Sequence, residues 1–244
     1  MAKVAVIVAG AGRGERFGTD RSKIFAKLQD RPLFVRALEM FVNREDVVQT
    51  ILAVSPADVE TVKEKYAANI MFMGVKLVEG GVERPETVRK ALAVVDESAD
   101  LIAVHDAVRV CVAAEWIDAV FAEAAKTGGA ILAAPLSGTI KRVTDQKVID
   151  ATVDRTGLWE AQTPQVFRRD VLMEAYEKLG DADGITDDAQ VVEQAGHPVA
   201  VVPCDGRNLK ITLPGDLKLA QACLRVLPKP KTKAPRSPFE EAQW

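Results

Sequence analysis

The first residues that could do chemistry lie in the segment AVIVAGAGRGERFG, which places four glycines and two arginines directly after an apolar run. Glycine lets backbone N–H groups converge on an anion, and Arg16 and Lys23 add positive charge beside them. The loop therefore favours a polyphosphate ligand. Because most cations lie on protein surfaces, the loop alone leaves open that Arg16 and Lys23 are only solvated charges.

Two common glycine motifs do not fit this loop. A dinucleotide turn, G-x-G-x-x-G, would need glycine where Glu15 stands when counted from Gly10, and where Phe17 stands when counted from Gly12. The second expected strand also runs out at 54–55 without a carboxylate to hold ribose. A Walker loop would close with Gly-Lys-Ser/Thr, which this loop lacks. An NAD-dependent oxidoreductase is thereby disfavoured.

A second candidate site follows an expected strand over residues 101–104, where Asp106 and Arg109 stand close together. Ligands of α/β sheets bind at the carboxyl ends of parallel strands, so both side chains are placed for substrate or metal contact. The alternative is that Asp106 and Arg109 form a structural ion pair at the strand end, since ion-pair networks also occur without a catalytic role.

The elements that must position these residues are read from hydrophobic patterning. Near-continuous apolar runs predict strands buried on both faces, at residues 4–8, 47–54, 101–104, 130–134 and 199–202. Apolar residues at three- and four-residue spacing predict helices between them, at residues 33–42, 57–68, 84–95, 115–126 and 214–226. Alternation of strand and helix predicts an α/β fold with a mostly parallel central sheet.

One segment breaks the alternation. TIKRVTDQKVIDATVDR, from Thr139 to Arg155, predicts two extended runs joined around residues 144–146. A lone hairpin is marginal in water, so packing against a second copy of the chain is an economical way to bury its apolar side chains. Residues 227–244 are rich in proline and lysine and are expected to form a disordered tail.

Composition limits the class of protein. The chain has 244 residues, 48% of them apolar, and a net charge of -3, which supports a globular enzyme and argues against general nucleic-acid affinity. Cys111, Cys204 and Cys223 form no CxxC pair, so buried reduced thiols are expected. No apolar run approaches the roughly 18 residues of a membrane span. A cytoplasmic location without membrane or nucleic-acid partners is the expectation.

Five further segments, taken in order with the glycine loop, resemble the 2-C-methyl-D-erythritol 4-phosphate cytidylyltransferase family over about residues 4–226. They are EGGVERPETV, AVHDAVRVC, TVDRTGLWEAQTPQVF, GITDDA and NLKIT. The resemblance implies a single Rossmann-like nucleotidyltransferase domain over residues 1–226, with an arm at about 137–157 that interlocks in a homodimer. It implies that CTP and a polyol phosphate give a CDP-polyol and pyrophosphate, with Mg²⁺ or another divalent cation present.

The resemblance also assigns roles. Arg16, Lys23, Lys210 and Arg155 are the implied catalytic cations. CTP would be bound by Ala9, Gly10, Ala11, Gly12, Gly80, Gly81 and Thr87. The polyol phosphate would be held by Asp106, Arg109, Thr139, Arg155, Thr163, Thr186 and Lys210, with Thr139 and Arg155 serving the second subunit. Asp106 would contact the metal through water. For Thr87, taken alone, an exposed hydroxyl on a helix is nearly as good an interpretation.

Such a reaction needs cations rather than a general base. The attacking phosphate monoester has its second pKa near 6, so it arrives already ionised. Positioning and charge neutralisation remain, which leaves no catalytic part for His105 or His197. Ser22, Val82, Val108 and Val110 depart from the family pattern. These departures leave open a non-catalytic nucleotide-binding homologue. A ribitol 5-phosphate cytidylyltransferase also stays open, because it shares the fold, the nucleotide and most of the motifs.

Overall fold

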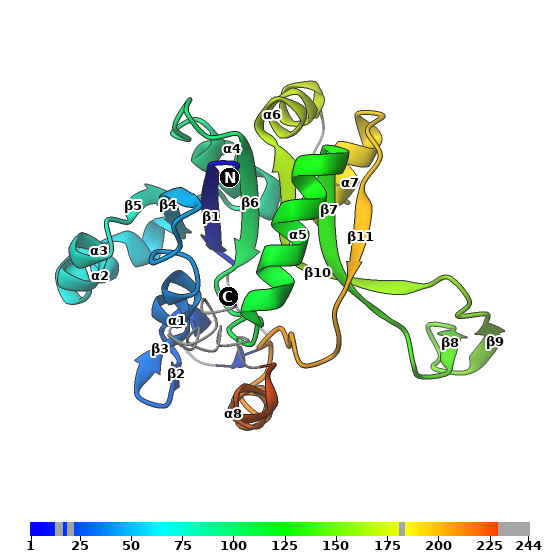
Figure 1. Cartoon of the computed structure of the whole chain (residues 1–244). Helices are drawn as coiled ribbons and strands as arrows, with labels where there is room; N and C mark the ends of the chain where they lie inside the picture. The colour runs from blue at the N-terminus through cyan, green and yellow to red at the C-terminus, as the bar shows by residue number, and fades with distance from the viewer. Residues whose placement is uncertain (13–16, 19–21, 181–183, 229–244) are drawn as a thin grey trace, which may run out of the picture.

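A computed structural model describes residues 1–12, 17–18, 22–180 and 184–228, and these form a central sheet of seven strands covered by helices on both faces (Figure 1). The strand order is β11-β7-β10-β6-β1-β4-β5. The strands are β1 (Val4–Gly10), β4 (Val47–Val54), β5 (Lys76–Glu79), β6 (Leu101–Asp106), β7 (Gly129–Pro135), β10 (Trp159–Arg168) and β11 (Ala200–Pro203). All neighbours pair in parallel except β10, which runs antiparallel to both β6 and β7. The predicted mostly parallel α/β sheet is confirmed.

The helices divide between the two faces of the sheet. They are α1 (Leu33–Glu39), α2 (Pro56–Lys65), α3 (Ala67–Phe72), α4 (Arg84–Leu92), α5 (Ala114–Thr127), α6 (Arg169–Lys178), α7 (Asp188–Gln194) and α8 (Asp216–Val226). One core packs α1, α2, α3, α5 and α8 against Val6 and Val8 of β1, while the other packs α4, α6 and α7 against Ile7. Successive strand side chains point to opposite faces, so a strand buried on both sides must be apolar throughout.

Several elements differ from the sequence expectation. The helix predicted over 57–68 is two helices, α2 and α3, because the backbone leaves the helical region at Tyr66. The short strand β5 and the helices α6 and α7 were not predicted. Strand β10 was not predicted either, because its buried residues Gln162, Thr163 and Gln165 are polar and interrupt the apolar pattern of a buried strand. A minor ribbon of β2 (Lys27–Leu28) and β3 (Arg31–Pro32) precedes α1.

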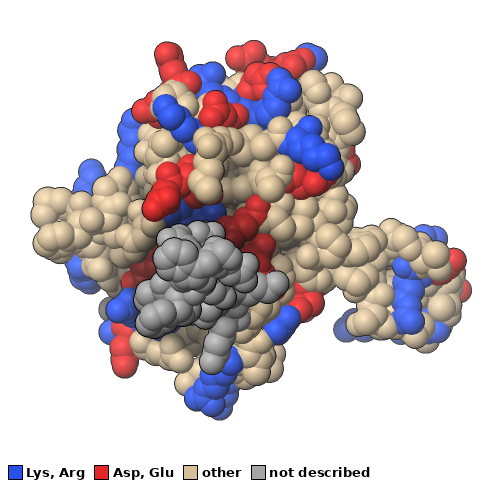
Figure 2. All heavy atoms as spheres, in the orientation of Figure 1, with Lys and Arg blue, Asp and Glu red and all other residues tan. Residues whose placement is uncertain are grey.

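The predicted hairpin is present and stands away from the rest of the molecule (Figure 1). Its strands β8 (Ile140–Val143) and β9 (Ile149–Val153) pair antiparallel in a sheet of their own. Long β7 and β10 lead to and from it. Figure 2 shows this arm, residues 137–157, as a separate lobe with basic side chains on the visible face. The described residues of the chain leave its apolar side chains Val143, Val148 and Ile149 exposed.

The ends of the described chain bear on two further expectations. Helix α8 finishes at Val226, and residues 229–244 of the predicted tail lie outside the described residues, so their disorder stays a prediction. All three cysteines are free, with Cys111 and Cys204 buried and Cys223 half-buried. Within the described ranges, no helix is long and apolar enough to cross a bilayer.

Candidate active site

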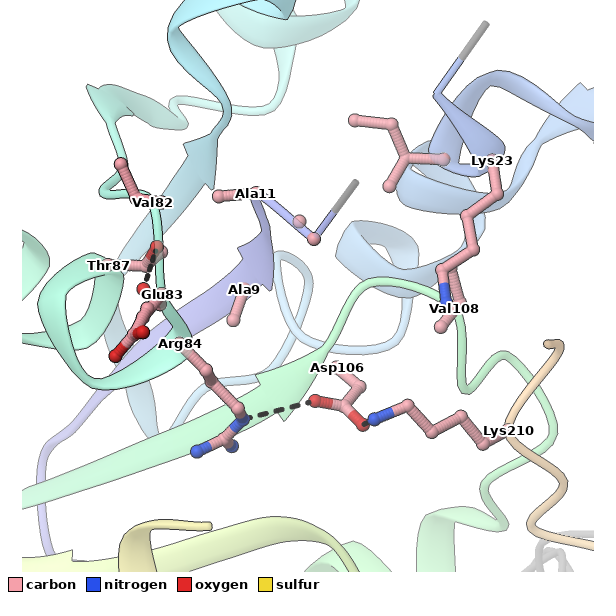
Figure 3. Close-up of a pocket in the computed structure, with 13 residues that line it drawn as sticks. Ala9, Ala11, Lys23, Val82, Glu83, Arg84, Thr87, Asp106, Val108 and Lys210 are labelled. Carbon is pink, nitrogen blue, oxygen red and sulfur yellow. Dashed lines mark hydrogen bonds and ion pairs between the residues drawn. The ribbon is translucent and has the colours of Figure 1, made fainter. Parts of the chain in front are cut away.

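A cleft of about 230 Å³ opens at the carboxyl ends of β1 and β6 (Figure 3). Its lining comes from segments well separated in sequence: Ala9, Gly10, Ala11, Gly12, Lys23, Ile24, Val82, Glu83, Arg84, Thr87, Asp106, Val108 and Lys210. Parallel pairing of β1 with β6 sets Ala9 opposite Asp106, so the glycine segment and the carboxylate reach the same edge of the sheet. Lys23, Asp106 and Lys210, predicted from distant motifs, therefore share one cleft.

Lys210 is aimed into the cleft by the buried residues around it. Asn208 is fully buried, and its side-chain amide donates to the carbonyl of Thr163 at 3.0 Å. The N–H of Ile211 donates to the carbonyl of Val108 at 3.2 Å. Lys210 lies between these anchors, and its Nζ is 2.8 Å from Oδ2 of Asp106. The buried residues Asn208 and Ile211 on either side of Lys210 thus fix the backbone that carries the amine.

Arg84 is a cleft residue that sequence reasoning missed, although it lies inside the quoted segment EGGVERPETV. It opens helix α4 and reaches Asp106 from the side opposite Lys210 (Figure 3). Its Nε is 3.7 Å from Oδ1 of Asp106, and its Nη2 is 2.6 Å from Oδ2 of the buried Asp188. An arginine directly before the first-turn proline of a helix at the sheet's carboxyl edge was the signal that could have found it.

Electrostatics keep Asp106 ionised. Burial alone would raise the pKa of this carboxyl, but Lys210, Arg84 and Arg109 together hold it far below its usual range. The same charges act in reverse on Arg84: burial disfavours the guanidinium, yet Asp188 and Asp106 raise its pKa above the ordinary value. At this point the cleft therefore presents a permanently charged carboxylate between permanent cations, an arrangement suited to binding anions rather than to exchanging a proton near neutral pH.

His105 holds the strand end from behind. Its Nε2 is 2.8 Å from the carbonyl of Arg109, which can only accept, so Nε2 carries the proton. Its Nδ1 must then accept from the hydroxyl of Thr163 at 3.0 Å, and that hydroxyl in turn accepts from the N–H of Asp106 at 3.0 Å. Burial lowers the pKa of His105 to about 4, so the ring is neutral. This chain of hydrogen bonds fixes the backbone that carries Asp106 and Arg109.

The wall formed by Gly80 and Gly81 is pinned by helix α4. The N–H of Gly81 donates to the hydroxyl of Thr87 at 3.0 Å, and Val82 N–H donates to the carboxylate of Glu86 at 2.8 Å. A Cβ on Gly80 would come within 2.7 Å of the Ala11 side chain. These contacts place Gly80 and Gly81 behind the cleft lining, while Thr87, 2% exposed, is no surface hydroxyl.

The remaining predicted residues lie apart from the cleft lining or are occupied elsewhere. Thr139 and Arg155 are exposed on the arm, where Arg155 donates to the carbonyl of Ser137. Thr186 is exposed beside α7 and donates to the side chain of Gln190. Thr163 is buried in the His105 chain described above. Their contact with a ligand stays a prediction.

Arg109 and Arg16 were also predicted as site residues. Arg109 is 5% exposed: its Nη1 donates to the carbonyl of Asn208 at 2.6 Å, and its Nε is 3.6 Å from Asp106. In this structure it braces the strand end, as the structural ion-pair interpretation expects. Arg16, one of the implied catalytic cations, lies outside the described residues, as does Glu15 of the rejected dinucleotide motif.

The cleft offers a metal ion a contact through water at Asp106 rather than a cluster of protein ligands. In the part of the chain that the structure describes, no three His, Cys, Asp or Glu residues are grouped to hold an ion. Asp106 is already engaged by Lys210. Mg²⁺ usually keeps several waters and binds one or two carboxylates together with substrate phosphates. Asp106 is therefore suited to contact such an ion through water while ligand phosphates supply most of its coordination.

Comparisons with known proteins agree on one family. A family model described as 2-C-methyl-D-erythritol 4-phosphate cytidylyltransferase matches residues 4–226. A protein of that name from Rhodopirellula baltica is 45% identical over 234 residues, which are 91% of this chain and 95% of the relative. Another from Solibacter usitatus is 39% identical over 236 residues, with 91% and 96% covered.

Solved structures give the same result. The crystal structure of 2-C-methyl-D-erythritol 4-phosphate cytidylyltransferase from Thermus thermophilus is 28% identical with a TM-score of 0.74, covering 93% of this chain and 100% of that one. A crystal structure of 4-diphosphocytidyl-2C-methyl-D-erythritol synthase is 34% identical with a TM-score of 0.76, covering 92% and 99%. Fold and sequence similarity therefore extend over nearly the whole of each chain.

Proposed function

Because the chain belongs to the 2-C-methyl-D-erythritol 4-phosphate cytidylyltransferase family, we propose that it transfers CMP from CTP to 2-C-methyl-D-erythritol 4-phosphate. The products are CDP-methylerythritol and pyrophosphate, in the non-mevalonate route to isoprenoid precursors. Family membership favours this nucleotidyltransferase over the ribitol phosphate and oxidoreductase alternatives. The use of CTP, a metabolite of the cell interior, supports a cytoplasmic location.

The observation that carries the proposal is the convergence of Lys23, Lys210 and Asp106 on one cleft beside the glycine segment 9–12. Two amines and a glycine-rich backbone suit a triphosphate, since backbone N–H groups and cations both favour anions. Asp106 is held ionised in the same cleft. A carboxylate suits the hydroxyls of a polyol or a hydrated metal far better than it suits phosphate.

In the mechanism, the protein's part is to position two phosphates and neutralise the charge that builds between them. The attacking monoester is ionised near neutral pH, so it needs no base. Lys23 binds the triphosphate, together with Arg16 outside the described residues. Lys210 stabilises the charge on the α-phosphate as the attacking oxygen approaches. Asp106 orients the Lys210 amine by accepting its hydrogen bond at 2.8 Å.

Cytosine recognition is assigned to the backbone of residues 9–11 and to the facing segment near Thr87. The small residues Ala9, Gly10 and Ala11 line the cleft, so main-chain groups can approach the edge of a base. Behind the opposite wall, Gly80 sets the spacing, because a Cβ there would come within 2.7 Å of the Ala11 side chain, while a Cβ on Gly81 would displace the flexible side chain of Glu86. A bound Mg²⁺, held through water by Asp106, would supply further neutralisation of the triphosphate.

The arm is assigned to a second subunit. Its apolar side chains are exposed in the single chain: Ile149 by 60%, Val143 by 50% and Trp159 at its base by 42%. A homodimer in which the arm crosses to the neighbouring subunit would cover them and bring Thr139 and Arg155 to the neighbour's cleft. Those two residues would then hold the attacking phosphate, a task that the cleft lining of a single chain leaves to Lys210.

The experiment is a pyrophosphate-release assay on the purified chain with Mg²⁺, testing CTP, UTP, ATP and GTP against methylerythritol phosphate and ribitol 5-phosphate. Release is expected with CTP and methylerythritol phosphate, and Lys23→Ala is expected to remove most of it while leaving the melting temperature unchanged. Equal turnover of ribitol 5-phosphate would favour the alternative substrate. Absence of release with every pair would contradict an enzyme of this class.

A further inference from the structure

Asp188 is a fully buried carboxylate for which the proposed mechanism has no use. It opens helix α7, and the hydroxyl of Tyr176 donates to its Oδ1 at 2.7 Å. Its Oδ2 is 2.6 Å from Nη2 of Arg84. Burying an ion pair usually gains little stability over an apolar pair of similar volume. A buried Asp188–Arg84 pair at the edge of a cleft therefore suggests a positional role.

Arg84 connects this pair to the chemistry. The same guanidinium that meets Asp188 has its Nε 3.7 Å from Oδ1 of Asp106, whose other oxygen accepts from Lys210. Figure 3 shows Arg84 and Lys210 reaching Asp106 from opposite sides. The charged guanidinium of Arg84 is attracted to both carboxylates. Its position between Asp106 and Asp188 therefore depends on the balance of these two attractions. Any weakening of the Asp188 side would let Arg84 move toward Asp106 and compete with Lys210.

The other end of the network is the segment 184–187, which carries Thr186. The carbonyl oxygen of the Gln165 side chain accepts from the N–H groups of Asp188 and Ala189, each at 3.0 Å. The Thr186 hydroxyl donates to Gln190, one turn into the same helix. Segment 184–187 and Asp188 therefore belong to one hydrogen-bonded unit, and a ligand that shifts Thr186 would act on Arg84 as well.

We propose that Asp188 is a positioning residue that acts through Arg84 to orient Asp106, and so couples segment 184–187 to the nucleotide cleft. The inference rests on the proposed function, because it takes Thr186 to lie on the polyol phosphate side and the cleft to hold CTP. Neither the roles implied by the motifs nor the proposed reaction assigns a task to Asp188 or Arg84. Binding of either substrate should then change the affinity for the other by the same factor, since coupling between two sites is reciprocal.

The test compares Asp188→Asn with Glu193→Gln, a control that removes one negative charge from an exposed position of the same helix α7. Asp188→Asn is expected to lower kcat/KM for methylerythritol phosphate by about ten- to a hundredfold, the loss typical of small misplacements. KM for CTP should change less, and Glu193→Gln should stay within about twofold of wild type.

A double-mutant cycle separates positioning from a merely structural role. If Asp188 acts through Arg84, then Asp188→Asn should cost little further activity once Arg84→Gln is present. Full additivity of the two losses, or wild-type kinetics in Asp188→Asn, would overturn the proposal. Tyr176→Phe keeps the carboxylate and the packing, so it should give a smaller loss of the same kind even if Asp188→Asn does not fold.

The outcome is distinguishable from failure of the proposed function. If the wild-type chain releases pyrophosphate and Asp188→Asn releases it at the same rate, only this inference is contradicted. A wild-type chain that releases none with any substrate pair would sink the proposed function, and the inference with it. Melting temperatures of all variants, measured with and without CTP, check that lost activity comes from folded protein.

Discussion

The cleft and the arm differ in how firmly they hold the side chains proposed to bind substrate. At the cleft, the N–H of Asp106 donates to the hydroxyl of the buried Thr163, and the carboxylate of Asp106 accepts from Lys210. On the arm, Thr139 and Arg155 are exposed, and the side chain of Arg155 donates to the carbonyl of Ser137 on the same arm. The cleft is thus preorganised within one chain, whereas the described part of the same chain does little to orient the side chains of the arm.

Assembly of two subunits matters for the arm more than for the cleft. A preorganised cation can act without rearrangement, which is where most of its catalytic benefit lies. The arm gains the same property only if another molecule covers Ile149 and orders Arg155. We expect substitutions in the cleft to act within the mutated subunit, and substitutions on the arm to act on the neighbour.

The largest effect is expected from Lys210→Ala. The change removes a cation fixed 2.8 Å from Asp106 while leaving the buried anchors Asn208 and Ile211 in place. We expect kcat to fall by about 10²- to 10³-fold, as for other preorganised charges. The melting temperature should also fall, because the buried Asp106 loses one of its three neighbouring cations. Pyrophosphate release measures the loss, and Lys218→Ala, on the exposed face of α8, is the control. A loss below about fivefold, on the order of a surface change, would contradict preorganisation.

The next effect belongs to the arm. Arg155→Ala is expected to lower turnover about tenfold or more by removing a charged contact to the attacking phosphate. Mixed with Lys23→Ala subunits, it should regain activity, because one cleft of each mixed dimer combines an intact Lys23 with an intact arm. Random exchange at equal amounts would restore about a quarter of the wild-type sites. No recovery after subunit exchange would place Arg155 in its own chain's site.

The sequence was sufficient to predict the main strands and the motif residues, but not the ion pair between Arg84 and Asp188. Strands such as β1 and β6 were predictable because burial on both faces requires nearly every residue to be apolar. Lys23, Asp106 and Lys210 were found through motifs, and the structure puts them together. The Arg84–Asp188 pair was missed because its members are polar and far apart in sequence, and no local pattern distinguishes a buried ion pair from two surface charges.

A third effect is a pH dependence specific to the cleft. His105 has its pKa lowered to about 4 in the folded chain, so the unfolded chain binds an extra proton below about pH 6.5. Stability from this group is full above about pH 6.5 and is lost as the pH falls toward about 4, in total about 3 kcal/mol. Urea unfolding between neutral pH and the folded-state pKa measures it. His105→Gln should flatten this slope.

The smallest effect on the folded chain is expected from Ile149→Thr on the arm. Threonine keeps the strand preference, and Ile149 is 60% exposed, so the free energy of unfolding of a single chain should change by less than about 0.5 kcal/mol. The same substitution at the fully buried Ile102 of β6 should cost about 2 kcal/mol or more, because it buries a hydroxyl and leaves a void. If the arm crosses to a neighbour, Ile149→Thr should nevertheless weaken the dimer, and sedimentation on dilution should detect it. A dimer equally stable to dilution in both proteins would show that Ile149 lies outside the interface, and the exposed arm would then need another explanation.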